Sequence, residues 1–280
     1  MPGATPPLDR RAFVVSTLSS GFALAVAAEA GSATASTSAE GLVAGAVAIP
    51  VAGGEVPAYR AAPKGASRAP VVLVVHEIFG VHEHIQDVCR RLAALGYLAV
   101  APELFARHGD ASKLKTSKEI LEQIVSKVPD REVLADLDAT LSWAGGHGGD
   151  TSRAAVVGFC WGGRVTWLYA AHNPLLRAGV AFYGRLVGAT DALRPRHPVD
   201  VAASLYVSVL GLYGGADDGI PQSSIDAMRA ALPDRAPRSQ IVVYPGAPHA
   251  FFADYRPSYR KDTAELAWAR LRAWLVDHGV

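Results

Sequence analysis

Cysteine and charge of one sign are both scarce in this sequence. Only two cysteines, Cys89 and Cys160, occur among 280 residues, and they lack the paired C-x-x-C spacing of zinc and redox sites. Two cysteines are also too few for a disulfide framework. The 27 lysines and arginines nearly balance the 26 aspartates and glutamates, so the formal net charge is only +1. This balance argues against nucleic acid or an acidic surface as a partner.

The composition is that of a globular chain. Hydrophobic residues make up 50% of the sequence and charged residues 19%, which is enough apolar material for one large core. After residue 41 the sequence contains no internal repeat and no low-complexity linker, and strand-like and helix-like segments alternate. We therefore expect residues 41–280 to form a single α/β domain with a mostly parallel, doubly wound sheet.

The N-terminal segment differs from the rest of the chain. Arg10 and Arg11 precede a weakly apolar run rich in Ala, Ser and Gly, and small-x-small sites follow at 28–30 and 33–35. This resembles a twin-arginine export signal, and the run is short for a membrane span. We expect residues 1–40 to be such a signal with a flexible segment, bound by the export machinery of a periplasmic or extracellular protein. A disordered Ala-rich tail and an uncleaved anchor are the alternatives, and the cleavage site stays open.

Hydrophobic periodicity and turn residues predict the individual elements. Strands are expected at 43–49, 56–61, 70–75, 97–101, 154–157, 178–183, 204–212 and 240–244, and helices at 85–95, 113–143, 165–171, 223–232 and 259–278. We expect the helical region 113–143 to divide at Pro129, with Asp130 capping its second half. The glycine cluster 145–150 is expected to be a flexible connection. Cys89 falls on the apolar side of its helix, which predicts a role in core packing.

One stretch combines a buried strand with a reactive side chain. A valine run ends in Gly158-Phe159-Cys160-Trp161-Gly162-Gly163, the spacing of a strand that bends sharply into a helix. Glycines flank the bend because the main chain approaches itself too closely there for a Cβ. Cys160 would lie at a helix N-terminus, where the helix dipole favours the nucleophilic thiolate. A buried structural cysteine fits the same motif, so the interpretation depends on partners elsewhere.

Two later loops supply such partners. Asp217 and Asp218 follow one predicted strand, and His249 follows the last one. Taken alone, each is a common loop or turn residue. The order nucleophile, acid, histidine is that of α/β-hydrolases, and open α/β sheets hold their ligands at the strand carboxyl ends. Together the three elements favour a catalytic triad on an α/β-hydrolase fold.

The same residues carry a family resemblance. From about residue 41 to the C-terminus the chain resembles the dienelactone hydrolase family, through segments 76–80, 101–107, 158–163, 215–221 and 248–251. In that family two residues and then Ile/Val-Pro follow the aspartate, which selects Asp217. The resemblance implies that Glu77 hydrogen-bonds the resting thiol and moves when substrate arrives. It also implies an oxyanion hole made by the backbone N–H groups of Ile78 and Trp161.

The resemblance extends to substrate binding, with one departure. It implies Arg107 as a clamp for a substrate carboxylate and Tyr183 as a pocket-lining residue, although a surface arginine and a core tyrosine would look the same in sequence. Dienelactone hydrolase itself has a second arginine four residues after the histidine, where this chain has Ala253, and Ala250 replaces a serine. Arg256 and Arg260 are the candidates to replace that arginine.

A metal site is the competing interpretation of one segment. His76, Glu77, His82, Glu83 and His84 form a dense cluster, but the spacing is not H-E-x-x-H. We expect His82 and His84 to point to different sides, which favours the triad over a metal site.

The sequence as a whole predicts a hydrolase that cleaves a small ester or lactone. A Cys160-Asp217-His249 triad would work through a covalent acyl-enzyme, without cofactor or metal, in a monomer of the dienelactone hydrolase or carboxymethylenebutenolidase type. The alternative is a non-catalytic binding or redox-sensing module on the same fold.

Overall fold

The structure is a computed structural model that describes residues 36–234 and 238–280. The predicted export signal lies outside these residues, apart from its last five, and stays a prediction. Over the described ranges, no helix has the length and apolar character that a membrane span requires. The ordered elements begin directly after the predicted domain boundary, with strand β1 at Leu42–Val51.

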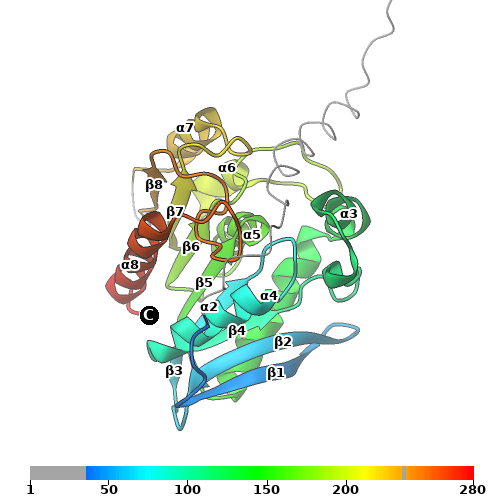
Figure 1. The fold of residues 1–280 in the computed structure, drawn as a ribbon, viewed down its shortest axis with the longest axis vertical. Helices are drawn as coiled ribbons and strands as arrows, with labels where there is room; N and C mark the ends of the chain where they lie inside the picture. The colour runs from blue at the N-terminus through cyan, green and yellow to red at the C-terminus, as the bar shows by residue number, and fades with distance from the viewer. Residues whose placement is uncertain (1–35, 235–237) are drawn as a thin grey trace, which may run out of the picture.

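One eight-stranded sheet forms the centre of the described chain (Figure 1). Its strands run in the order β1-β2-β4-β3-β5-β6-β7-β8. Beyond β1, these are β2 (Gly54–Pro63), β3 (Ala69–Val75), β4 (Leu98–Pro102), β5 (Gly149–Phe159), β6 (Ala178–Phe182), β7 (Ser208–Gly214) and β8 (Gln240–Tyr244). The strands β4, β3, β5, β6, β7 and β8 are parallel, whereas the β1–β2 and β2–β4 pairs are antiparallel. The mostly parallel sheet that the sequence predicts is confirmed.

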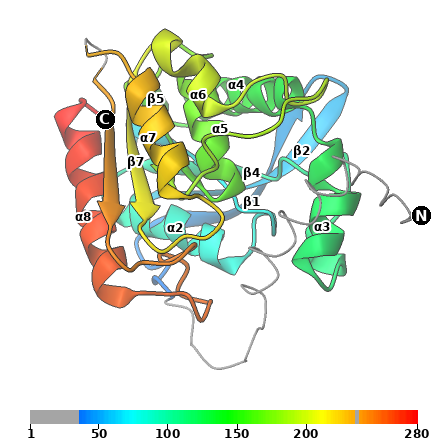
Figure 2. The same cartoon turned by 90° about the horizontal axis from the view of Figure 1, so that it is seen from above.

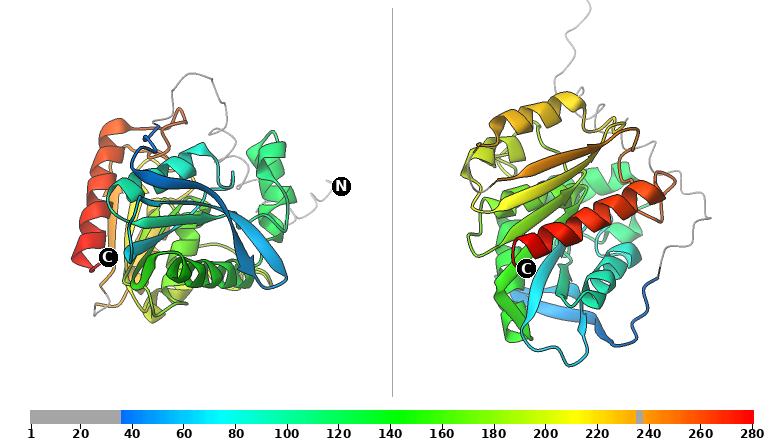
Figure 3. Two further views of the ribbon diagram at one scale, coloured as in Figure 1. Left: turned by 90° about the horizontal axis from the view of Figure 1, so that it is seen from below. Right: turned by 90° about the vertical axis from the view of Figure 1, so that its left-hand side faces the viewer.

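Helices cover both faces of this sheet (Figures 2 and 3). The long helices α2 (Glu83–Ala94) and α8 (Lys261–Asp277) lie on one face, and the right-hand view of Figure 3 shows α8 crossing it. The opposite face is covered by α4 (Asp130–Gly146), α5 (Trp161–Ala170) and α7 (Gln222–Ala231). The shorter elements are α3 (Ser117–Gln123), α6 (Pro198–Val201), and the 3-10 turns η1 (Ala111–Lys113), η2 (Val125–Lys127) and η3 (Ala202–Ser204).

The central strands are buried on both sides. Five of the seven residues of β3, Val71 to Val75, are fully buried, and β4 and β6 are buried along their whole length. Continuous Val- and Ala-rich strands of this kind are what a sheet with helices on both faces requires. Cys89 on α2 is also fully buried, so its predicted role in core packing is confirmed.

The strand order reverses in the middle of the sheet. From β3 the chain moves outward to β4, and it then returns to β5 on the other side of β3. At such a reversal the loops after the two strands diverge and leave a crevice at the strand carboxyl ends, where open α/β sheets bind their ligands. The loop after β3 carries Glu77 and Ile78, and the loop after β5 carries Cys160. The topology therefore gathers these residues at one edge of the sheet.

Three local predictions were wrong. Asp130 does not cap α4, since its carboxylate accepts two hydrogen bonds of 2.7 Å from the buried guanidinium of Arg164. The glycine cluster is not a flexible connection, because Gly145 and Gly146 end α4 and Gly149 begins β5. The strand expected at 204–212 begins only at Ser208, because a 3-10 turn occupies Ala202–Ser204.

The contact of α5 with the end of β6 gives a stability prediction. A Cβ at Gly163 would lie 2.4 Å from the carbonyl oxygen of Phe182, whereas a Cβ at Gly146, also in a helix, would meet nothing within 4 Å. Gly163→Ala should lower the free energy of unfolding by about 2–3 kcal/mol or more, because the clashing atoms belong to the backbone. Gly146→Ala should raise it by roughly 0.5–1 kcal/mol through the better helix propensity of alanine. Urea denaturation of both variants checks this, and equal midpoints would contradict it.

Candidate active site

Cys160 occupies the bend between β5 and α5. Its φ of 54° lies in the left-handed region, which a non-glycine residue rarely adopts, and it is the N-cap of α5. A Cβ at Gly158 would lie 2.1 Å from the carbonyl oxygen of Gly162, and one at Gly162 would lie 2.3 Å from that of Val75. The rare backbone conformation at this bend and the need for both glycines, expected from the sequence, are confirmed.

The structure brings Cys160, His249 and Asp217 together. The His249 Nε2 atom lies 3.3 Å from the sulfur of Cys160, and its Nδ1 atom lies 2.6 Å from Oδ2 of Asp217. Because an ionised carboxylate only accepts, Nδ1 carries a proton and donates to it. The Asp217 side chain is fully buried, and its other oxygen accepts a hydrogen bond from the N–H of Gly219. Each carboxylate oxygen of Asp217 thus has a donor, which fixes the orientation of the imidazole.

The charges around His249 favour its protonated form. Burial by itself lowers the pKa of this histidine, but the negative charge of Cys160 and the hydrogen-bonded Asp217 carboxylate outweigh it and raise the pKa to about 10. The arrangement therefore favours a protonated His249 between the Cys160 sulfur and the Asp217 carboxylate.

Two backbone N–H groups near the thiol have no acceptor. Within residues 36–234 and 238–280, neither the N–H of Ile78 nor that of Trp161 donates a hydrogen bond. The packing of Gly162 against the carbonyl oxygens of Val75 and His76 brings the two segments together. Free donors beside a nucleophile are what an oxyanion hole requires.

His76 holds the peptide group that carries one of these donors. Its Nε2 accepts a hydrogen bond from the N–H of Leu104 at 3.1 Å, so the proton is on Nδ1, which donates to the carbonyl oxygen of Glu77 at 2.6 Å. Burial lowers the pKa of His76, which keeps the ring neutral. The Glu77 carbonyl and the Ile78 N–H belong to one planar peptide unit, so fixing the carbonyl also aims the N–H. The ring stacks on Trp161 at 5.4 Å.

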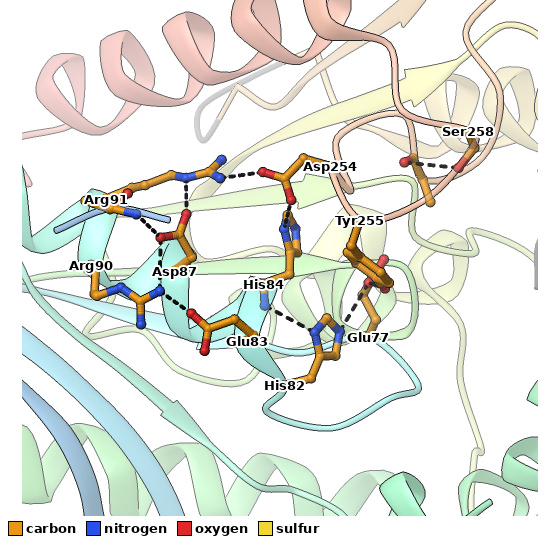
Figure 4. Close-up of polar contacts among 12 residues, drawn as sticks. Glu77, His82, Glu83, His84, Asp87, Arg90, Arg91, Asp254, Tyr255 and Ser258 are labelled. Carbon is orange, nitrogen blue, oxygen red and sulfur yellow. Dashed lines mark hydrogen bonds and ion pairs between the residues drawn. The ribbon is translucent and has the colours of Figure 1, made fainter. Parts of the chain in front are cut away.

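Glu77 contacts Tyr255 and His82 in this structure, not the thiol. The hydroxyl of Tyr255 donates to Oε2 of Glu77, and Nε2 of His82 lies 3.7 Å from the same oxygen (Figure 4). Burial acts to raise the pKa of this carboxyl, but His82, Arg256 and His84 lower it to about 2, so Glu77 is ionised. In this structure the Cys160 sulfur contacts His249, and within the described residues no hydrogen bond joins it to Glu77. The predicted hydrogen bond between Glu77 and a resting thiol stays a prediction.

The remaining acids and bases of this segment are paired with one another (Figure 4). His84 is buried and bonds Asp254 at 2.9 Å, and Arg91 joins Asp254 to Asp87. The His82 and His84 rings are 6.1 Å apart and nearly parallel, so the expectation that they point to different sides was wrong. Each imidazole is nevertheless engaged by a different carboxylate. This network joins α2 to the loop after β8.

Arg107 and Tyr183 differ in their relation to the site. The Arg107 guanidinium is bound by two carboxylates of α4, at 2.5 Å from Asp136 and 3.1 Å from Glu132, and its role as a substrate clamp stays a prediction. Tyr183 is fully buried, and its ring centroid is 5.1 Å from that of His249. Its hydroxyl has no hydrogen-bond partner within the described ranges. Tyr183 therefore borders the site, and its substrate contact remains a prediction.

Comparison with known proteins identifies the family. A model of the dienelactone hydrolase family matches residues 56–279. The chain belongs to the dienelactone hydrolase family. A protein of Methylorubrum extorquens, provisionally named carboxymethylenebutenolidase, is 56% identical over 99% of this chain and 96% of its own length. A protein of Salmonella typhimurium with the same provisional name is 55% identical over 84% of this chain and 88% of its own.

Solved structures agree in fold. The crystal structure of a provisionally assigned dienelactone hydrolase from Klebsiella pneumoniae has a TM-score of 0.82 and 54% identity, covering 84% of this chain and 98% of that chain. A dienelactone hydrolase-like phosphotriesterase from metagenomic libraries, at 22% identity and a TM-score of 0.67, shares the fold alone. The family membership and the single-domain α/β-hydrolase fold expected from the sequence are confirmed.

This family member has a buried arginine, Arg256, close to Glu77. The sequence offered Arg256 and Arg260 as the two candidates to replace the arginine that is absent at Ala253. Arg256 is 5% exposed, its guanidinium lies 5.2 Å from the Phe79 ring centre, and the charge of Glu77 raises its pKa against the effect of burial. Arg260 is exposed and donates to the carbonyls of Pro257 and Tyr259. Tyr255 was not identified from the sequence as the partner of Glu77. Its place beside Arg256, in the segment that follows His249, was the only signal that could have indicated it.

The coupling of His249 to Cys160 gives a prediction for its titration. In the unsubstituted protein the imidazole should titrate well above the ordinary value of 6.5, and Cys160→Ala should move the titration down because the thiolate charge is gone. Nitrogen-15 NMR of labelled histidine across a pH series measures this. Cys89→Ala, which removes the other thiol, should leave His249 unchanged. Titration near 6.5 in all three proteins would show that the thiol and imidazole are not coupled.

Proposed function

We propose that this protein hydrolyses an ester or lactone through a covalent acyl-enzyme on Cys160, an activity of the carboxymethylenebutenolidase type that its relatives' names suggest. The observation that supports this most directly is the contact chain from the Cys160 sulfur to His249 at 3.3 Å and on to Asp217 at 2.6 Å. The proposal includes the family membership but goes beyond it, because it names the nucleophile and the course of the reaction.

In the first half-reaction the Cys160 thiolate attacks the carbonyl carbon. A C–S bond forms, and the carbonyl π electrons move to oxygen, where the N–H groups of Ile78 and Trp161 stabilise the negative charge. When this intermediate collapses, the C–O bond to the leaving group breaks. The protonated His249 gives its proton from Nε2 to the departing alkoxide, while Asp217 holds Nδ1. The result is a thioester on Cys160 and a neutral imidazole.

In the second half-reaction water replaces the alcohol. His249 takes a proton from water as hydroxide attacks the thioester carbonyl, and the same N–H groups hold the second oxyanion. The C–S bond then breaks, which releases the acid and restores the thiolate beside a protonated imidazole. Water is the only co-reactant, and no residue changes its oxidation state.

The nucleophile assignment is tested by removing each thiol in turn. Cys160→Ala should lower kcat for an activated ester by at least about a thousandfold, while its melting temperature stays close to that of the unsubstituted protein. Cys89→Ala should keep its activity, because burial in α2 raises the pKa of Cys89 and leaves that thiol unreactive. Mass spectrometry of the rapidly quenched unsubstituted enzyme should show one acyl group on Cys160. Undiminished turnover by Cys160→Ala would rule out the mechanism, and ligand binding without any turnover would favour the binding or redox-sensing module.

His76 is tested as a positioning residue for the oxyanion hole. His76→Phe keeps a ring against Trp161 but loses the hydrogen bond to the Glu77 carbonyl, so kcat should fall by about tenfold to a hundredfold with little change in KM. His76→Asn can still donate to that carbonyl, since its amide nitrogen replaces Nδ1, and should recover part of the loss. If both variants lose kcat equally, packing and not this hydrogen bond is the cause. Melting temperatures of the two variants control for a general loss of stability.

A further inference from the structure

A cavity lies beside the loop that carries Asp217. Its volume is about 330 Å³, and it is enclosed by the segment that follows β6 and by the start of α7. Gly219, whose N–H bonds Asp217, is part of its wall. The wall is mostly apolar, with one charged group, and its main side chains are those of Arg185, Leu186, Val187, Ile220, Pro221 and Ala227.

Arg185, the charged group of this cavity, is half-buried and lacks a protein partner. Across residues 36–234 and 238–280 its side chain makes no hydrogen bond and no ion pair. The two arginines whose charges reach it are both paired, Arg164 with Asp130 and Arg194 with Asp191. None of its nitrogens is fully enclosed by the described residues, so the guanidinium is open to solvent or to a molecule in the cavity. Its donors are therefore available to a ligand that enters the cavity.

The position of Arg185 relates the cavity to the nucleophile. It lies two residues after Tyr183, whose ring packs on His249, and directly after Gly184, where a Cβ would be 2.2 Å from the backbone of Gly163 in the first turn of α5. Burial lowers the pKa of Arg185, and the negative charge of Cys160 acts in the opposite direction. Arg185 and the cavity therefore adjoin the same strand end as Tyr183, whose ring packs on His249.

We propose that this cavity is a substrate subsite in which Arg185 binds a carboxylate at the end of a small apolar acyl group. The inference rests on the proposed function, since it assumes an ester whose carbonyl carbon reaches Cys160. The planar guanidinium suits a carboxylate, and the apolar wall suits a short hydrocarbon chain. Arg107 is less suited to the same task, because Asp136 and Glu132 already bind its guanidinium.

The test compares two esters that differ only in charge. One is p-nitrophenyl hydrogen adipate, which carries a terminal carboxylate, and the other is its neutral methyl ester. Arg185→Gln should lower kcat/KM for the anionic ester by about tenfold or more, because a charge-assisted hydrogen bond is lost, and should change the neutral ester by less than about twofold. Arg185→Lys keeps the charge but loses the planar guanidinium. Its kcat/KM for the anionic ester should lie between the values of the unsubstituted protein and of Arg185→Gln.

Two further variants decide between explanations. Arg194→Gln removes the same charge from the neighbouring loop without touching the cavity, so it should leave the preference for the anionic ester unchanged. Equal losses for both esters in Arg185→Gln, or no loss for either, would overturn the subsite. So would a selective loss of the anionic ester in Arg107→Gln with none in Arg185→Gln, which would assign the carboxylate to Arg107.

A binding measurement separates this inference from the proposed function. Adipate should bind the Cys160→Ala protein in calorimetry, and adding Arg185→Gln should weaken that binding by about tenfold or more. If the unsubstituted protein hydrolyses neither ester, the proposed function fails, and this measurement still decides whether Arg185 holds a carboxylate. If hydrolysis depends on Cys160 but adipate binds equally with and without Arg185, the subsite fails alone.

Discussion

The first turn of α5 lies directly on the end of β3, and the arrangement of the site depends on this contact. No Cβ could be accommodated at Gly162, because the carbonyl oxygens of Val75 and His76 lie within 3 Å of where it would be. The contact brings the loop after β3, which carries Ile78, against the first turn of α5, which begins at Trp161. It also allows the His76 ring to stack on Trp161 while it holds the Glu77 carbonyl. Backbone proximity at the point where the strand order reverses thus places two N–H groups that have no acceptor among the described residues, those of Ile78 and Trp161, in adjoining segments.

Electrostatics at the site divides into two connected groups. The first is the line from Cys160 through His249 to Asp217, where a negative charge at each end raises the pKa of the histidine between them. The second is centred on Glu77, a buried carboxylate whose pKa is held near 2 by His82, Arg256 and His84. Tyr183 lies between the groups, since it packs on His249 and both Glu77 and Cys160 act on its hydroxyl. A change in the charge of one group is therefore expected to shift the pKa values in the other.

The sequence was sufficient for the fold and for the three residues that meet at the strand ends. Periodicity identifies buried parallel strands such as β3, and the order of Cys160, Asp217 and His249 along the chain restricts the topology. The sequence was insufficient to predict the partner of a side chain that can pair with more than one group. Asp130 was expected to cap α4, yet the N-cap is Pro129, and Asp130 is the first residue of the helix and pairs with Arg164, because a buried guanidinium needs a carboxylate. The partners of Glu77 and Arg107 depend on segments brought together only by folding, which no local pattern encodes.

Positive φ angles at residues other than glycine are concentrated around Cys160 and His249. Within the described ranges they occur at four residues, and three of these, Cys160, Tyr183 and Ala250, are at the site or adjoin His249. Each such conformation costs on the order of 1–3 kcal/mol. The hydrophobic core of the sheet has to compensate for that strain, so the tolerance of the distant strands to mutation and the geometry of the reactive centre are thermodynamically linked. Evolution of a new specificity in this scaffold would begin with a reserve of stability already reduced by the backbone strain at Cys160, Tyr183 and Ala250.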